Sequence, residues 1–164
     1  DGVERWIGIV DLATRKPRGS VAIDKLVAAV GKLAKRASGD VWTLGKGEIE
    51  GAPTVVLENR ALKAINHLAC DHQLTVDVEY DAMENGLPTK IEANALAELE
   101  DALTAAVPAL VFHSRETSAG ARSLFYFAPA AVEKKVAAWA KKQRRKLIYT
   151  FEADPDWTGL ERYR

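Results

Sequence analysis

The six residues from His67 to His72, in the order His-Leu-Ala-Cys-Asp-His, carry the side chains best suited to chemistry. They include the only cysteine of the 164-residue chain and two of its three histidines. Histidine and cysteine side chains that converge can bind zinc, and a histidine beside a cysteine can serve as the base for a thiol nucleophile. Both uses depend on which element carries these residues and on which way it turns them.

Residues 59–69 carry apolar side chains at helical spacing, and Asn59 is a suitable N-cap for the helix that this spacing predicts. If Ile65 faces the core, His67 and Cys70 fall on the solvated side, beside basic residues that would repel a divalent cation. The C-terminal end of a helix also disfavours a thiolate. We therefore interpret the segment as a polar helix end, and we expect neither a metal site nor a cofactor.

A second polar group follows in the segment 74–81, where acidic residues alternate with apolar ones. This alternation predicts a strand with one buried and one solvated face. A strand predicted at 109–116 would bring His113 and Arg115 beside these acids in the same sheet. The set could hold Mg²⁺ or Ca²⁺ in a hydrolase, or it could form a charged surface with cross-strand pairs. We favour the charged surface and assign no catalytic residue; the expected partner-binding residues are Asp77, Glu79, Asp81, His113 and Arg115.

The elements predicted from residue 74 onwards follow the order β-α-β-β-α-β. The strands are expected at 74–80, 109–116, 122–127 and 146–152. One helix is expected from a cap at Thr89 to Val107, and a second follows Pro129. The buried stripe of the first helix is expected to consist of Ile91, Leu96, Leu99, Leu103 and Val107. This order predicts a ferredoxin-like arrangement in the C-terminal half.

The first half of the chain gives a weaker pattern. A strand at 5–12, a helix with apolar residues at 23–33 and short strands at 40–44 and 53–58 suggest a related or pseudo-repeated α/β unit. The sequence thus predicts the α+β class, with an N-terminal α/β subdomain at 1–73 and a ferredoxin-like subdomain at 74–164. No Ser- or Pro-rich linker separates them, so we expect one compact body.

The charge and motif content narrow the function classes. Lys plus Arg equals Asp plus Glu at 23 each, so no net field recruits nucleic acid or an anionic membrane. The chain has no apolar run of about 18 residues, as a membrane span requires. No P-loop or Gly-x-Ser-x-Gly motif is present, which favours a protein that is not an enzyme. The N-terminal residues lack a signal-peptide pattern, so we expect a cytoplasmic location, or a periplasmic one if a leader has been removed.

Four short motifs occur in a characteristic order: Asn-Gly-Leu-Pro at 85–88, Glu-Leu-Glu-Asp-Ala-Leu at 98–103, Leu-Phe-Tyr-Phe-Ala-Pro at 124–129 and Asp-Pro-Asp-Trp at 154–157. With this order, residues 74–160 resemble the bacterial family called domain of unknown function 695. That family looks related to the regulator of ribonuclease E activity B, which has a similar α+β domain and acts by binding a nuclease. The resemblance implies protein interaction and supplies no catalytic residues. It also leaves structural roles for the motifs, with a turn at Gly86 and Trp157 as a lid on the core.

The leading hypothesis is a non-enzymatic protein-binding or regulatory module of bacterial origin. A more specific alternative is an immunity or antitoxin protein that masks a toxin. A second alternative is a metal-dependent hydrolase that uses the acidic cluster. A protein partner is expected in the first two cases, nucleic acid in none, and the sequence leaves the oligomeric state open.

Overall fold

The computed structural model describes residues 39–163, together with the isolated positions Arg18 and Lys25. The strand predicted at 5–12 and the helix predicted from apolar residues at 23–33 lie outside the described residues. The elements of the described part are β1 (Trp42–Ile49), β2 (Ala52–Asn59), η2 (Ala64–Asn66), β3 (His72–Glu79), α2 (Lys90–Ala106), β4 (Val111–Ser118), β5 (Ala121–Ala128), η3 (Ala130–Val132), α3 (Glu133–Ala140), β6 (Leu147–Ala153) and η4 (Thr158–Tyr163).

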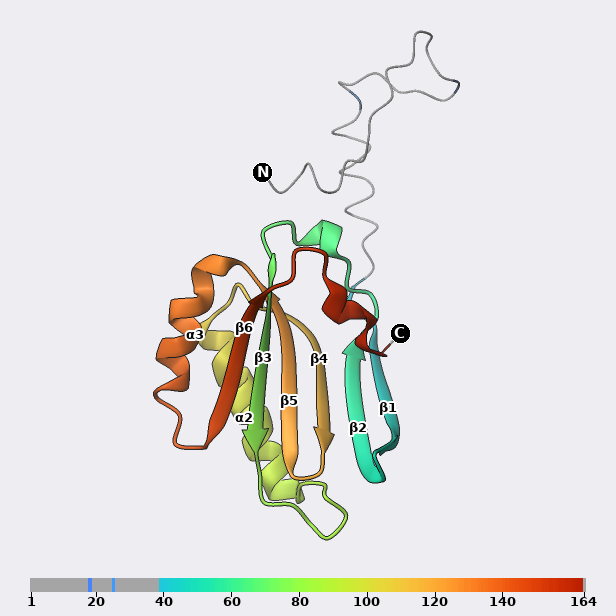
Figure 1. Cartoon of the computed structure of the whole chain (residues 1–164), viewed down its shortest axis with the longest axis vertical. Helices are drawn as coiled ribbons and strands as arrows, with labels where there is room; N and C mark the ends of the chain where they lie inside the picture. The colour runs from blue at the N-terminus through green and yellow to red at the C-terminus, as the bar shows by residue number, and fades with distance from the viewer. Residues whose placement is uncertain (1–17, 19–24, 26–38, 164) are drawn as a thin grey trace.

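The six strands of the described part form one antiparallel sheet in the order β1-β2-β4-β5-β3-β6. The predicted α+β class is therefore confirmed, as is the β-α-β-β-α-β order from β3 to β6. The hairpin β1–β2 joins the same sheet through β2 and β4. In Figure 1 it extends the sheet at the edge away from α3, beyond the helices that back the other strands.

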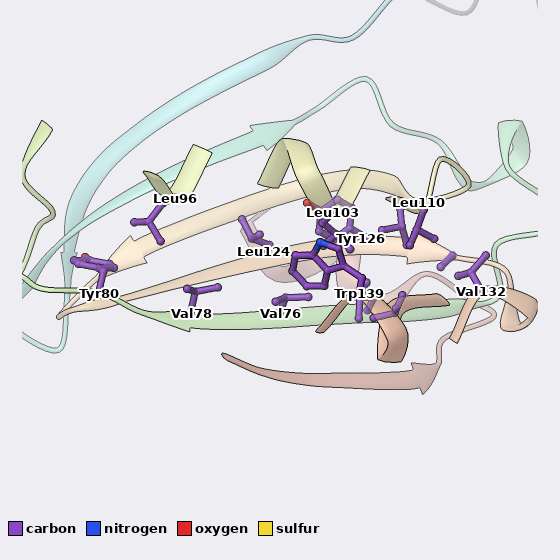
Figure 2. Close-up of a cluster of buried hydrophobic side chains, with 14 residues drawn as sticks. Val76, Val78, Tyr80, Leu96, Leu103, Leu110, Leu124, Tyr126, Val132 and Trp139 are labelled. Atoms are coloured by element: carbon purple, nitrogen blue, oxygen red, sulfur yellow. The ribbon is translucent and has the colours of Figure 1, made fainter. Parts of the chain in front are cut away.

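The main core lies between one face of the sheet and the two helices. As predicted, Leu74, Val76, Val78 and Tyr80 of the β3 segment are buried on this face. They pack with side chains of β5, α2 and α3 in a single cluster, which includes Leu124, Tyr126, Leu96, Leu103, Val136 and Trp139. Figure 2 shows Trp139 lying over the strand residues at the centre of this cluster. Both helices thus cover the same face of the sheet.

Helix α2 begins and ends where the sequence indicates. The Thr89 hydroxyl accepts a hydrogen bond from the Glu92 backbone N–H at 3.2 Å, which is the predicted cap. The predicted buried stripe is right except at Ile91, which is 83% exposed. Ile91 lies five residues before Leu96, and at about 100° per residue this turns it roughly 140° away from the buried side.

The opposite face of the sheet is partly covered by the C-terminal segment after β6. The Trp157 ring lies flat on the Phe127 ring, with centroids 3.8 Å apart and an interplanar angle of 6°. Leu160, Leu62 and Cys70 complete this second cluster. The Asp154 carboxylate fixes the segment, because it accepts hydrogen bonds from the backbone N–H groups of Thr158 and Gly159 at 2.8 and 3.0 Å. The lid predicted for Trp157 is therefore confirmed.

The Asn-Gly-Leu-Pro motif forms a turn that docks on the β4–β5 hairpin. Gly86 has a positive φ of 77°, and its carbonyl accepts from the backbone N–H of Gly120 at 2.9 Å and from the Tyr80 hydroxyl at 2.8 Å. A Cβ at Gly86 would lie 3.2 Å from the Ala119 Cα atom. Both the backbone conformation and the close approach therefore favour glycine here.

We expect Gly86→Ala to lower the free energy of unfolding by about 1–3 kcal/mol, since it adds left-handed strain to a close backbone contact. Gly51→Ala tests the backbone strain without the close contact, because Gly51 also has a positive φ, of 79°, but no atom lies within 4 Å of an added Cβ. Gly47→Ala has neither problem and should leave stability nearly unchanged or slightly raised. Urea unfolding of the three variants checks this order, and equal losses at all three positions would contradict it.

Candidate functional site

An open groove of about 660 Å³ lies at one end of the sheet. It is bounded by the end of β2, the start of β4 and the segment 60–71, which crosses this end of the sheet in Figure 1. Its walls are mainly apolar, and Trp42 and Phe112 stand together in one wall with ring centroids 5.5 Å apart. Trp42 is 43% exposed and Leu68, which also lines the groove, is 40% exposed. The groove therefore presents large apolar side chains to the solvent.

The polar rim of the groove is organised by Asn59, whose side chain is buried at the end of β2. Its Oδ1 atom accepts from the backbone N–H groups of Val41 and Ala61 at 3.3 and 3.1 Å. Its Nδ2 atom donates to the Asp40 carboxylate at 2.7 Å. Asn59 thus holds the chain on either side of the β1–β2 hairpin and fixes the carboxylate of Asp40 at the rim.

His67 also lines the groove, and its ring stacks on the Trp157 ring with centroids 5.8 Å apart. Burial lowers the pKa of His67 below its ordinary value of 6.5, although the nearby Asp40 carboxylate acts in the opposite direction. The lowered pKa favours the neutral form of the imidazole in the groove.

The helix predicted over residues 59–69 is wrong, because the structure contains only the short η2 turn at Ala64–Asn66. Ile65 is 54% exposed, whereas Cys70 is 7% exposed, which is the reverse of the predicted orientation. The cause is tertiary: the Trp157 indole N–H donates to the Cys70 carbonyl at 2.6 Å, and the Cys70 side chain packs in the cluster beneath Trp157. This contact holds the segment in a turn-rich path across the end of the sheet.

Cys70 is poorly suited to act as a nucleophile. Burial raises the pKa of its thiol, and the neighbouring Asp71 carboxylate raises it further. The Asp71 carboxylate is itself bound to Nδ1 of His72 at 2.8 Å, and this hydrogen bond is the main reason that its pKa is lowered. In the part of the chain that the structure describes, no three His, Cys, Asp or Glu side chains are grouped as metal ligands.

The five expected partner-binding residues do not form one site. Asp77 is half-buried and accepts from the Ser123 hydroxyl at 2.5 Å, and Glu79 pairs with Lys146, directly before β6, at 2.7 Å. Asp81 is exposed and lines a charged groove with Glu92 and Arg145, which form an ion pair. The hydrogen bond from Arg145 lowers the pKa of Glu92. The charges of this groove thus largely compensate one another.

The expectation that His113 and Arg115 lie beside the acids of β3 is wrong, because β5 lies between β3 and β4. A β-bulge at residue 113 also separates these two residues. The extra residue turns Arg115 toward α2, where it pairs with Glu100 at 3.1 Å, while His113 is fully buried on the other face near Phe127.

One known protein family matches most of the described residues. A family model described as a family of unknown function (DUF695) matches residues 40–162. The chain belongs to this family. No curated protein and no solved structure matches the chain. Among the described residues, no helix combines the length and apolar character needed to cross a membrane.

The DUF695 match corrects the range expected from the motifs. That range began at residue 74, whereas the family includes the β1–β2 hairpin and the segment 60–71. The groove is therefore built within the DUF695 domain itself. We did not predict the groove residues Asp40, Trp42, Asn59 and Phe112 from the sequence. The one local signal for the groove was Trp42, a tryptophan in a short predicted strand.

Proposed function

We propose that this DUF695 domain is a non-enzymatic module that binds another protein through the groove at the end of its sheet. The observation that carries the proposal is the open apolar groove of about 660 Å³, whose lining includes the exposed side chains of Trp42 and Leu68. Protein interfaces concentrate their binding energy in aromatic and aliphatic anchors that fill such hollows. An apolar side chain of the partner would contact the apolar lining, which includes Leu68 and Phe112.

The chemistry of the groove favours binding over catalysis. Its cysteine has a raised pKa because of burial, and its histidine has a lowered pKa for the same reason. A neutral imidazole can donate one hydrogen bond to a partner and accept another, and a buried thiol with a raised pKa is a poor nucleophile. These properties suit a recognition surface with a few polar groups.

We also infer that the part from β3 to β6 has the ferredoxin-like arrangement predicted from the sequence. The antiparallel order β4-β5-β3-β6, with α2 and α3 packed on one face, supports this inference. The predicted kinship with the regulator of ribonuclease E activity B remains a prediction, and it agrees with a protein-binding role. In this arrangement the β1–β2 hairpin is an addition that builds one wall of the groove.

A site-specific photocrosslinker tests the proposal. We expect a crosslinker at Leu68 to capture a defined partner in a lysate of the producing cells. The same crosslinker at Ile148, which is 60% exposed on β6 at the far edge of the sheet, should capture none. Leu68→Asp should weaken binding of the identified partner at least tenfold, or about 1.4 kcal/mol, while Ile148→Asp should not. Equal capture at both positions, or none at Leu68, would refute the groove as the binding site.

A further inference from the structure

Strand β1 is an outer strand with an unusual amount of exposed apolar surface. Its only neighbour in the described sheet is β2. Its large apolar residues Trp42, Leu44 and Ile49 are 43%, 58% and 46% exposed, and Val41, directly before the strand, is 50% exposed. On β6, the other outer strand, only Ile148 belongs to this group. Long apolar outer strands usually pair with another strand or carry features that prevent pairing.

The hydrogen-bond pattern shows which backbone groups of β1 face outward. The backbone N–H of Arg60 donates to the Val41 carbonyl at 2.9 Å, and these two residues follow on from the first pair of the β1–β2 register, Trp42 with Asn59. Hydrogen-bonded pairs alternate along an antiparallel ladder, so the odd-numbered residues of β1 face β2. The N–H and C=O groups of Trp42, Leu44 and Lys46 therefore point away from the sheet.

We propose that β1 pairs antiparallel with β1 of a second copy of this chain, about a two-fold axis that passes beside Thr43. Trp42 then lies opposite Leu44 of the other copy, and Lys46 lies opposite Asp40. The two-fold axis forms each of these pairs twice. The two six-stranded sheets continue into one, and the pairing shares Trp42 and Asp40 with the lining of the groove.

This register matches the side chains better than registers with the axis at Leu44 or at Lys46. It places apolar residues on apolar residues and gives Lys46 an oppositely charged partner, since the Asp40 carboxylate keeps acceptor sites besides the one that Asn59 uses. An axis at Leu44 would place Asp40 opposite Glu48, and an axis at Lys46 would place two lysines together. Opposite charges across a strand pair stabilise it and like charges destabilise it. The zero net charge of the chain also removes long-range repulsion between copies.

Light scattering of the full chain after size exclusion tests the assembly directly. We expect a mass of twice the 17.9 kDa of one chain. Lys46→Asp should raise the dissociation constant at least tenfold, because it places two carboxylates together at each end of the pairing. A monomeric full chain at high micromolar concentration would overturn the proposal, and it would show that another segment or a different protein covers β1.

A charge swap tests the register. Asp40→Lys and Lys46→Asp should each be monomeric alone, whereas an equimolar mixture should form a dimer that joins one chain of each kind. Thr43→Cys should form an intermolecular disulfide on oxidation, since opposed residues in a non-hydrogen-bonded pair lie about 4.5 Å apart at Cα. Ile148→Cys is the matched control and should stay monomeric; the buried Cys70 should not interfere. A mixture that stays monomeric although both variants fold by circular dichroism, or equal crosslinking at 43 and 148, would overturn this pairing.

Discussion

Replacing Trp157 with alanine is expected to lower the free energy of unfolding by about 3–5 kcal/mol, the range found when a large buried aromatic side chain is truncated. Trp157 is 3% exposed, it stacks flat on Phe127, and its indole N–H donates to the Cys70 carbonyl at 2.6 Å. The substitution removes the ring that joins the C-terminal segment to the segment 60–71. Urea unfolding measures the loss, and faster reaction of Cys70 with a thiol reagent should accompany it.

Two control substitutions separate the contributions of Trp157. Trp157→Phe retains a ring on Phe127 but leaves the Cys70 carbonyl without its donor, so a loss of about 1–3 kcal/mol is expected. Residue 157 has a positive φ of 56°, which strains alanine and phenylalanine alike. This strain therefore largely cancels when the stabilities of the two variants are compared. Trp42→Ala removes a ring that is 43% exposed and should cost clearly less than Trp157→Ala. Similar losses at 42 and 157 would contradict the role assigned to the C-terminal lid.

The sequence predicts an element best where local signals determine it. The alternation from Leu74 to Tyr80 correctly indicates the strand and its buried face, because period two and burial on one side are properties of the segment itself. The Thr89 cap and Pro108 likewise locate the ends of α2 within a residue or two. The strands predicted at 109–116 and 122–127 are found as well, as the hairpin of β4 and β5, whose two-residue turn has Ala119 and Gly120 at positive φ.

The failures occur where distant residues decide the local structure. Residues 59–69 have a helical pattern, yet the Trp157 indole, 87 residues away, binds the Cys70 carbonyl and the segment folds as turns. His113 and Arg115 have the spacing of one strand face, but the bulge between them places them on opposite faces. A bulge changes the parity of all residues that follow it, and its position depends on the pairing with β5 rather than on β4 alone.

The groove could not be predicted because its walls come from segments that only the strand order brings together. Trp42 and Phe112 are neighbours because β2 links β1 to β4, and this order is not encoded in the local pattern of either strand. The acids of β3 were easier to notice because they are contiguous in sequence. They proved to be bound individually, Asp77 to Ser123 and Glu79 to Lys146.

Arg122 is the least expected residue of the main core. It is 6% exposed on the helix-covered face, opposite Val78 of β3 and Thr117 of β4. Its Nε atom donates to the Thr117 hydroxyl at 3.0 Å, while Nη1 has no hydrogen-bond acceptor among the described residues. Burial lowers the pKa of the guanidinium, and the like charge of Arg115 acts in the same direction. The folded protein therefore holds a cation whose loss of hydration is only partly offset.

We accordingly expect Arg122→Met to raise the free energy of unfolding by about 1–4 kcal/mol, the range found when buried ion pairs are replaced by apolar side chains of similar volume. Arg115→Met is the matched control on the neighbouring strand. The Arg115 side chain is 30% exposed and bound to Glu100 at 3.1 Å, so its removal leaves a carboxylate without its partner and should cost about 1 kcal/mol. Replacing arginine with methionine is thus expected to raise the free energy of unfolding at position 122 and to lower it at position 115, although both residues lie on one face of the sheet. Urea unfolding of both variants measures this difference. A loss of stability in Arg122→Met would contradict the expectation. It would mean that the interactions of the guanidinium with Thr117 and with the distant carboxylates of Glu92 and Glu100 stabilise the fold by more than its burial costs.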